Sequence, residues 1–454
     1  MVRHEFLMGK SGQGKTEGIL SRIAQQMSRG GGLLFVDPKP TKETASAIFN
    51  LALSYGREQD FRLLDIYSPE KSHSVNFFLE GSADEATSTI SAIFGSGASD
   101  NESAEHFKQQ LLTAVSNRVG CIKKIGKAFN AMDLFILLTN PNAIQWLINN
   151  TPESQERMAI TIEFDAYVNE KGNNREFDKR SLKSQVGGGA NRLLTYGTGK
   201  LGQMMNTYSP QFNMHDAVYN NRLVYVPLPK LDMSEQSDAF ARMLLSAVKI
   251  EVARAYREGA PLKPFLNIWD EFGSIAVPGT EELVEKMRGA NFAGIFSFQT
   301  HANLIKVGEA FAARLIGNCE IRTFMALGDA DSRNFASELI GELLKNFGSK
   351  SMGMGTSSAN TNLDVELFNR IGKSTSEGEG SAERYDYAIR PEQLRDLPVG
   401  QAYVVPMAAS RAFRVQFPMV KTPFNLPIEL PVVTTPRVVG LNLTAMFNES
   451  FSTG

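Results

Sequence analysis

The feature that most constrains the fold of this chain is the segment Gly9–Thr16, which follows a short apolar run and precedes a helical pattern. Its glycines permit a backbone whose N–H groups point inward at phosphate, a conformation that a Cβ would block. The G-x-x-x-x-G-K-T spacing supplies a lysine for the β- and γ-phosphates and a threonine hydroxyl for Mg²⁺. We predict that ATP and Mg²⁺ bind a loop formed by Gly9, Lys10, Ser11, Gly12, Gln13, Gly14, Lys15 and Thr16.

Composition excludes several classes of protein. Of the 454 residues, 42% are hydrophobic and 21% charged, as in ordinary globular domains. The net charge of −2 gives no overall basic field, so contact with nucleic acid must come from a local patch or from assembly. The two cysteines, Cys121 and Cys319, lie far apart without metal-binding spacing, which fits a reducing cytoplasmic compartment. No apolar run approaches the ~18 residues that span a bilayer, so no membrane span is expected in this chain.

Short apolar runs alternate with helical patterns in two separate stretches of the chain. They occur at Glu5–Met8, Leu33–Val36, Phe61–Ile66, Arg222–Leu228, Phe265–Trp269, Ala293–Phe298 and Ile321–Ala326. Buried strands of this length, each followed by a helix, are typical of an α/β protein. We therefore predict a central, mostly parallel sheet with helices on both faces.

The stretch between the two α/β parts has a different character, because helical patterns dominate it and strand-like runs are scarce. We interpret it as an inserted all-α domain, in which Gly187–Gly189 and Gly197–Lys200 form loops. The Gly- and Ser-rich stretch 346–384 is expected to be a mobile loop with some secondary structure in its middle. The expected division is a P-loop domain over 1–82 and 215–421, an all-α insertion over 83–214, and a Pro-rich tail over 422–454 that wraps the surface.

Two acids end the buried run Phe265–Trp269. Asp270 is placed to hold Mg²⁺, and Glu271 to polarise the water that attacks a phosphate. Alternatively, such a pair of acids only caps a helix at the end of a strand. The phosphate loop upstream favours the catalytic role.

Three further positions carry side chains that could take part in the same chemistry. Gln299 ends the next strand, beside the acidic pair, where it can orient water or sense the γ-phosphate. Arg288 ends the intervening helix and is either a solvated charge or an arginine finger for a neighbouring subunit. The turn Asp37–Lys39 ends the second strand at the same edge of the sheet.

A small basic patch lies in the helical stretch. It consists of Lys123, Lys124 and Lys127, and it is either a solvated face or a contact for DNA.

An ordered series of motifs resembles type IV secretion coupling proteins, the TraG/TraD-like conjugation ATPases of the FtsK–HerA branch of RecA-type motors. The series comprises Gly9–Thr16, Leu34–Lys39, Val75–Phe78, Val224–Pro229, Trp269–Gly273, Arg288–Ile295 leading to Gln299, and Leu397–Gly400. The resemblance implies a RecA-like P-loop NTPase with an inserted all-α domain, and it covers roughly residues 1–420.

The resemblance also implies function. Such proteins are homo-hexameric rings at the cytoplasmic face of the bacterial inner membrane. They link a relaxosome to a secretion channel and use ATP to move single-stranded DNA with its attached relaxase. The resemblance further implies that Arg288 acts on the neighbouring subunit's nucleotide and that Gln299 occupies a sensor position.

Two departures from the family pattern qualify this expectation. The family's N-terminal transmembrane domain is absent, so membrane attachment would come from a missing segment or from a partner. Pro40 and Thr41 stand where the family usually has Gly-Glu. Two alternatives stay open: a related FtsK/HerA-type DNA or secretion motor, acting on single-stranded or duplex DNA, and a nucleotide-dependent relaxosome or effector receptor with little turnover.

Overall fold

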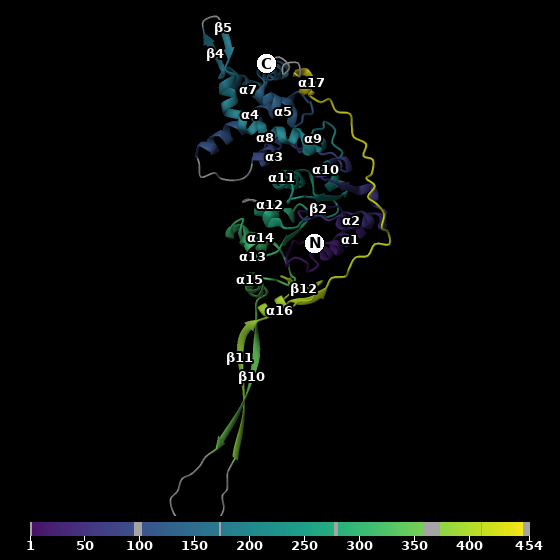
Figure 1. Ribbon diagram of the computed structural model, residues 1–454, viewed down its shortest axis with the longest axis vertical. Coiled ribbons are helices and arrows are strands. Elements are labelled where there is room, and N and C mark those ends of the chain that lie inside the picture. The colour runs from purple at the N-terminus through teal and green to yellow at the C-terminus, as the bar shows by residue number, and fades with distance from the viewer. Residues whose placement is uncertain are drawn as a thin grey trace, which may run out of the picture.

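The computed structural model describes residues 2–94, 102–171, 174–276, 280–356, 373–409 and 411–447. Within these ranges the chain forms an elongated body around one nine-stranded sheet (Figure 1). The strand order is β13-β12-β9-β1-β8-β7-β2-β6-β3. The strands are β1 Glu5–Met8, β2 Leu33–Asp37, β3 Phe61–Leu63, β6 Leu223–Pro227, β7 Phe265–Trp269, β8 Phe292–Phe298, β9 Ile321–Phe324, β12 Gln401–Pro406 and β13 Phe413–Gln416.

The predicted mostly parallel sheet is confirmed. Every pairing from β3 across to β9 is parallel, whereas β12 runs antiparallel to β9 and β13 antiparallel to β12. The carboxyl ends of β1, β2, β7 and β8 therefore meet at one edge of the sheet. The loops that follow these four strands come together there, and they include the segment Gly9–Thr16.

The alternation of side chains along the strands explains why helices cover both faces. Leu33 and Phe35 of β2 pack into one apolar core, while Leu34 and Val36 pack into the other. The first core also contains residues of α1 (Lys15–Ser28) and α2 (Lys42–Ser54). The second is covered by the long helix α11 (Ser234–Glu258), with other helices beside it.

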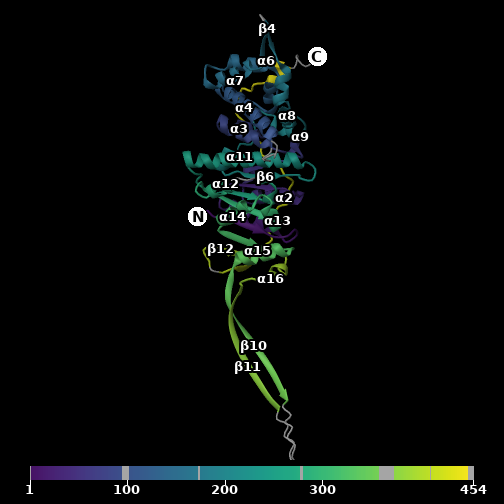
Figure 2. The same ribbon diagram turned by 90° about the vertical axis from the view of Figure 1, so that its left-hand side faces the viewer.

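A helical region stacks on the outer side of α11 (Figures 1 and 2). Its helices are α3 Ala83–Ser91, α4 Glu102–Lys124, α5 Ala131–Thr139, α6 Pro141–Asn150, α7 Gln155–Asp165, α8 Lys179–Gly197, α9 Gly199–Met205 and α10 Met214–Tyr219. A short antiparallel hairpin, β4 (Val168–Lys171) with β5 (Asn174–Phe177), also lies there and was not expected. In the part of the chain that the structure describes, no helix has the length and apolar character needed to cross a membrane.

The glycine clusters of this region were wrongly predicted to be loops. Gly187–Gly189 lies inside α8, and only Thr198 separates α8 from α9. A Cβ on Gly189 would stand 1.9 Å from the Leu111 side chain of α4, so this glycine lets the two helices approach closely. Glycine was needed here for space rather than for a turn.

The remaining helices belong to the sheet-bearing part and its tail. They are α12 Thr280–Met287, α13 His301–Ile305, α14 Glu309–Asn318, α15 Ala330–Ile340, α16 Pro391–Arg395 and α17 Leu443–Phe447. The helices α12 to α14 follow β7 and β8 and pack on the same face as α11.

The Gly- and Ser-rich stretch 346–384 was predicted to be a loop with some secondary structure only in its middle, and this is wrong for its described parts, which form strands. Strand β10 (Glu342–Thr356) pairs with β11 (Lys373–Tyr387) in one continuous antiparallel register. The hairpin projects from the body at the end opposite the helical region (Figures 1 and 2). Backbone hydrogen bonds form this ladder, and a composition of small residues gives no signal for them. The middle of the stretch, 357–372, lies outside the described residues.

The chain after β13 wraps the surface as expected, and we call its residues 417–447 the strap. It starts on α1, where Phe417 receives the Arg22 guanidinium over its ring at 4.4 Å. Its middle is held to α2, because Asn50 exchanges two side-chain hydrogen bonds with the backbone of Leu426. It ends in the helical region, where α17 packs on α5 (Figure 1). The strap thus connects the helix of the phosphate loop to the far side of the molecule.

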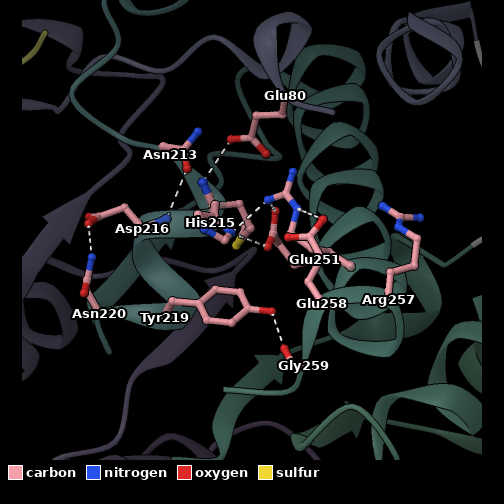
Figure 3. Close-up of polar contacts among 12 residues, drawn as sticks. Glu80, Asn213, His215, Asp216, Tyr219, Asn220, Glu251, Arg257, Glu258 and Gly259 are labelled. Atoms are coloured by element: carbon pink, nitrogen blue, oxygen red, sulfur yellow. Dashed lines mark hydrogen bonds and ion pairs between the residues drawn. The ribbon is translucent and has the colours of Figure 1, made fainter. Parts of the chain in front are cut away.

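A buried polar junction joins the helical region to α11 (Figure 3). The Glu80 carboxylate accepts a hydrogen bond of 2.9 Å from the backbone N–H of Met214. Next to it, Glu251 of α11 is bound by the His215 ring at 3.0 Å and by the Arg254 guanidinium at 2.5 Å. The division into domains that the sequence suggested stays a proposal, and this junction is where its two parts would meet.

Candidate functional site

The segment Gly9–Thr16 forms the loop between β1 and α1. Gly12 and Gly14 have φ values of 75° and 90°, in the left-handed region that favours glycine. The loop is packed from outside by the turn before β12, because the Gly400 N–H donates to the carbonyl of Gln13 at 2.9 Å. A Cβ on Gly9 would stand 2.8 Å from the Met325 side chain. The loop is therefore closely packed at its base and open at its tip, where Ser11 is exposed.

Lys15 begins α1 and its side chain is buried. Its Nζ donates to the Gly9 carbonyl at 2.7 Å, inside the curve of the loop. Burial lowers the pKa of this lysine, while the charges of Asp270 and Glu271 oppose that effect. A partly desolvated ammonium that faces a loop of inward N–H groups is suited to bind phosphate oxygens.

Asp270 and Glu271 follow β7, directly beside the end of β2. The N–H of Asp270 donates to the Val36 carbonyl at 3.1 Å, and the N–H of Glu271 donates to the Asp270 carboxylate at 3.0 Å. Glu271 has a φ of 47°, a conformation that costs a non-glycine residue roughly 1–3 kcal/mol. The sequence motif therefore produces a sharp turn that fixes both carboxyl groups at the carboxyl edge of the sheet.

The Glu271 carboxylate, which follows β7, contacts residues that follow two other strands of the sheet. Lys39, which follows β2, forms an ion pair with its Oε1 at 2.7 Å. The side-chain amide of Gln299, which follows β8, donates to the same oxygen. The structure thus brings Gln299 and Glu271 into contact, as their places at the ends of neighbouring strands predicted.

Asp37 and Tyr225 form a buried pair under Lys39. The Tyr225 hydroxyl of β6 donates to one Asp37 oxygen at 2.9 Å, and the Lys39 N–H donates to the other at 2.9 Å. The pKa of Asp37 is raised to about 6, chiefly by burial; the Lys39 N–H opposes this rise and the nearby charge of Asp270 adds to it. Sequence reasoning missed Tyr225, although its alternation with Val224 and Val226 marks one face of β6.

Arg288 lies away from the other predicted site residues, and its role as a finger for a neighbouring subunit stays a prediction. It follows α12 and precedes β8, so it lies at the amino edge of the sheet. There its guanidinium pairs with Glu320, just before β9, and its side chain is 61% exposed. Because Gly9–Thr16 lies at the opposite edge, Arg288 has no access to the phosphate loop of its own chain.

The donor set fits a magnesium ion. Thr16 is exposed in the first turn of α1 and offers a hydroxyl, and Asp270 is a buried carboxylate that follows β7 at the same edge of the sheet. Mg²⁺ takes oxygen ligands, and proteins bind it through one or two such groups together with substrate phosphates. Thr16 and Asp270 could therefore hold it, with the phosphates completing the site.

The lysines of the small basic patch are engaged within the chain. Lys123 donates from Nζ to the carbonyls of Leu79 and Gly81. Lys124 pairs with Glu156, and Lys127 lies over the Trp146 ring. These contacts favour a structural reading of the patch over a surface for DNA.

The sequence of this chain is similar to those of known proteins. Residues 264–398 match the family described as the TraM recognition site of TraD and TraG. The chain is 25% identical over 415 residues to the type 4 coupling protein DotL of Legionella pneumophila subsp. pneumophila, covering 81% of this chain and 52% of DotL. It thus spans about half the length of that relative.

Solved structures share the fold. An unbound form of the bacterial conjugative coupling protein TrwB superposes with a TM-score of 0.60 at 16% identity, covering 95% of this chain and 88% of that one. TrwB in complex with ADP and Mg²⁺ gives 0.61 at 14% identity, covering 94% and 87%. VirB4 of Thermoanaerobacter pseudethanolicus gives 0.52 at 12% identity, covering 93% and 90%.

The sheet, the phosphate loop and the acidic pair define a RecA-like P-loop NTPase fold with an additional helical region. The family match over 264–398 contains the acidic pair, Gln299 and Arg288. The chain is similar in sequence to type IV coupling proteins.

Proposed function

We propose that this chain is the ATP-hydrolysing core of a type IV secretion or conjugation coupling protein. It recruits single-stranded DNA with its attached relaxase and moves them toward the secretion channel. The observation that carries the proposal is the convergence of Lys15, Asp270, Glu271 and Gln299 at one edge of the sheet. A site that only holds a nucleotide has no need of a carboxylate base beside a buried lysine.

The residues divide the work of hydrolysis. ATP binds as substrate with its phosphates against Gly9–Thr16, where backbone N–H groups and the start of α1 favour negative charge. Lys15 binds the β- and γ-phosphates, and Glu271 accepts the proton of the attacking water. Gln299 orients that water. Mg²⁺, when bound, neutralises charge on the β- and γ-phosphates.

The position of Arg288 is the reason for proposing an oligomer. It lies at the edge of the sheet opposite the phosphate loop, so it can act on a nucleotide only from a neighbouring subunit. In a closed ring of head-to-tail contacts, the amino edge of one subunit's sheet lies against the nucleotide site of the next subunit. We propose a homo-hexamer of this kind at the cytoplasmic face of the bacterial inner membrane, in contact with relaxosome proteins and channel components.

An ATPase assay tests the function. Turnover is measured with single-stranded DNA, duplex DNA and no DNA, over a range of protein concentrations, alongside a mass measurement. We expect turnover to rise with DNA and with concentration, and Lys15→Ala and Glu271→Gln to abolish it. Lys42→Ala, an exposed lysine at the start of α2, is the control and should behave as wild type. Turnover that ignores DNA, and a wild type no faster than Glu271→Gln, would refute the motor function.

A second candidate is a nucleotide-dependent receptor for relaxosome or effector proteins with little turnover. It is favoured by one observation: the Glu271 carboxylate is already engaged by Lys39 and Gln299 in this structure. Nucleotide binding without hydrolysis in the same assay would support it. A related FtsK/HerA-type motor would instead respond to duplex DNA more strongly than to single strands.

A further inference from the structure

Lys39 does not have the surroundings of an ordinary surface lysine. Its ammonium pairs with Glu271 at 2.7 Å although 57% of its side chain is exposed. An exposed ion pair contributes only about 0–1 kcal/mol to stability, so this one is of little use for holding the fold together. Its position on the proposed catalytic carboxylate calls for a different explanation.

The backbone that carries Lys39 is rigid. Its N–H is bound by the buried Asp37 carboxylate, which the Tyr225 hydroxyl holds from the other side. Pro38 fixes the preceding backbone dihedral. A flexible side chain therefore leaves from an anchored point at the carboxyl edge of the sheet, and its ammonium can exchange one partner for another without movement of the backbone.

The charges around Lys39 leave a place for an anion. Lys39 and Lys15 lie near enough that the charge of Lys39 lowers the pKa of Lys15, and both lysines face the pair Asp270 and Glu271. A phosphate group that enters between the two ammonium groups gains both of them as partners. It would also compete with Glu271 for Lys39 and for the amide of Gln299.

We propose that Lys39 is a positioning residue. Its ion pair with Glu271 keeps that carboxylate from binding the attacking water until the γ-phosphate of ATP binds Lys39 instead. The inference rests on the proposed function and adds to it a residue that senses whether ATP or ADP is bound. In the resting state one oxygen of Glu271 receives two donors, so it is not free to bind the attacking water. With ATP bound, Lys39 transfers to the terminal phosphate and Glu271 is released. ADP has no terminal phosphate at that place, so it leaves the pair intact.

Equilibrium binding tests the proposal independently of turnover. The affinities of a non-hydrolysable ATP analogue and of ADP are measured for wild type, Lys39→Ala, Lys39→Arg and Lys42→Ala. Loss of one charge-assisted phosphate contact should cut the preference for the ATP analogue over ADP about tenfold in Lys39→Ala. Lys39→Arg should keep most of the preference, because arginine also binds phosphate. Lys42→Ala, three residues further along, should match wild type.

A double variant tests the exchange of partners. If Glu271 holds Lys39 in the resting state, Glu271→Gln frees the lysine and strengthens binding of the ATP analogue several-fold, while ADP binding stays unchanged. The gain should vanish in Lys39→Ala/Glu271→Gln, because the freed group is missing. A gain that persists in the double variant would overturn the proposal.

The remaining outcomes are also decisive. An unchanged nucleotide preference in Lys39→Ala would overturn the proposal, and so would a parallel loss of both affinities with a lowered Tm, which would mean that Lys39 only supports the fold. If wild type binds both nucleotides but hydrolyses no ATP, the proposed function fails, yet the preference still decides the role of Lys39.

Discussion

Glu80 accepts its hydrogen bond from the backbone N–H of Met214 in a site that is closed to water, at the junction between the helical region and α11 (Figure 3). Its second carboxylate oxygen has no partner among the described residues. The pKa of Glu80 is raised to about 7, chiefly by burial; the Met214 N–H, Arg254 and Lys123 oppose this rise, and the charge of Glu251 adds to it. The junction therefore holds a carboxyl group that is protonated well above its usual range.

This pKa predicts how stability depends on pH. Because the folded-state pKa exceeds the ordinary 4.5, the folded chain keeps a proton that the unfolded chain releases between pH 4.5 and about 7. The contribution of Glu80 is thus complete below pH 4.5 and falls as the pH rises to about 7, by up to about 3 kcal/mol. Glu80→Gln keeps the acceptor and removes this loss. Its Tm should exceed that of wild type at pH 8 and match it at pH 4.5.

The control for this prediction is Glu153→Gln, which changes an exposed glutamate in the same helical region. Its Tm should follow wild type at both pH values. A Glu80→Gln variant less stable than wild type at pH 8 would mean that the carboxylate is charged in the folded state and is stabilised by Arg254 or Lys123.

The strap should detach when its end loses its apolar anchor. Leu443 is 0% exposed, and its N–H donates to the Asp133 carboxylate at 2.9 Å. Leu443→Ala removes buried contacts worth about 2–5 kcal/mol, and most of that loss should appear as local opening of the strap. Limited proteolysis should then cut residues 417–447 several times faster than in wild type. Val439→Ala, at a position 68% exposed, should leave the rate unchanged, and equal rates in all three proteins would contradict the prediction.

The parts of the site that sequence could predict are those fixed by local spacing. Gly9–Thr16 is a continuous motif, and Asp270 and Gln299 come directly after apolar runs that could only be buried strands. The contact between Gln299 and Glu271 followed from the parallel sheet alone. Lys39 was noticed only as part of a turn, because its partner Glu271 is 232 residues away and no local pattern joins them.

The failures have physical causes of their own. Glycine was interpreted as a breaker at Gly189, but there its missing side chain makes room for Leu111. The stretch 346–384 lacked the apolar alternation of a half-buried strand, and its described strands pair through backbone groups that are the same for every residue type. The edge on which Arg288 lies was not predicted at all, because only the sheet order shows that the end of its helix faces away from the phosphate loop of its own chain.

Both cysteines should be inert in the folded protein. Cys121 and Cys319 are buried, and burial raises the pKa of each thiol above its ordinary value. Since the thiolate is the reactive form, neither should react with a water-soluble disulfide reagent at pH 8 within minutes. Both of the chain's cysteines should react at once in denaturant. Rapid labelling of one thiol in the native protein would show that its surroundings open easily.

Arg288 should be needed for turnover but not for nucleotide binding. Strand β8 separates it from the carboxyl edge, and its seven residues at about 3.3 Å each span roughly 20 Å. No arginine side chain covers that length, so Arg288→Ala should bind nucleotide as wild type does. Its hydrolysis should fall by a factor of 10³ or more, the loss typical of a missing arginine finger. A loss of nucleotide affinity would instead assign Arg288 a structural role through its pair with Glu320.

Mixing two inactive variants distinguishes a shared site from one that is complete within each chain. Lys15→Ala destroys a subunit's phosphate loop but leaves its Arg288 intact, and Arg288→Ala does the reverse. In a randomly mixed ring, about a quarter of the interfaces pair an intact loop with an intact arginine. The mixture should therefore recover up to about a quarter of wild-type turnover, although neither variant is active alone. If each site were complete within one chain, both subunits of every pair would stay inactive and mixing would restore nothing.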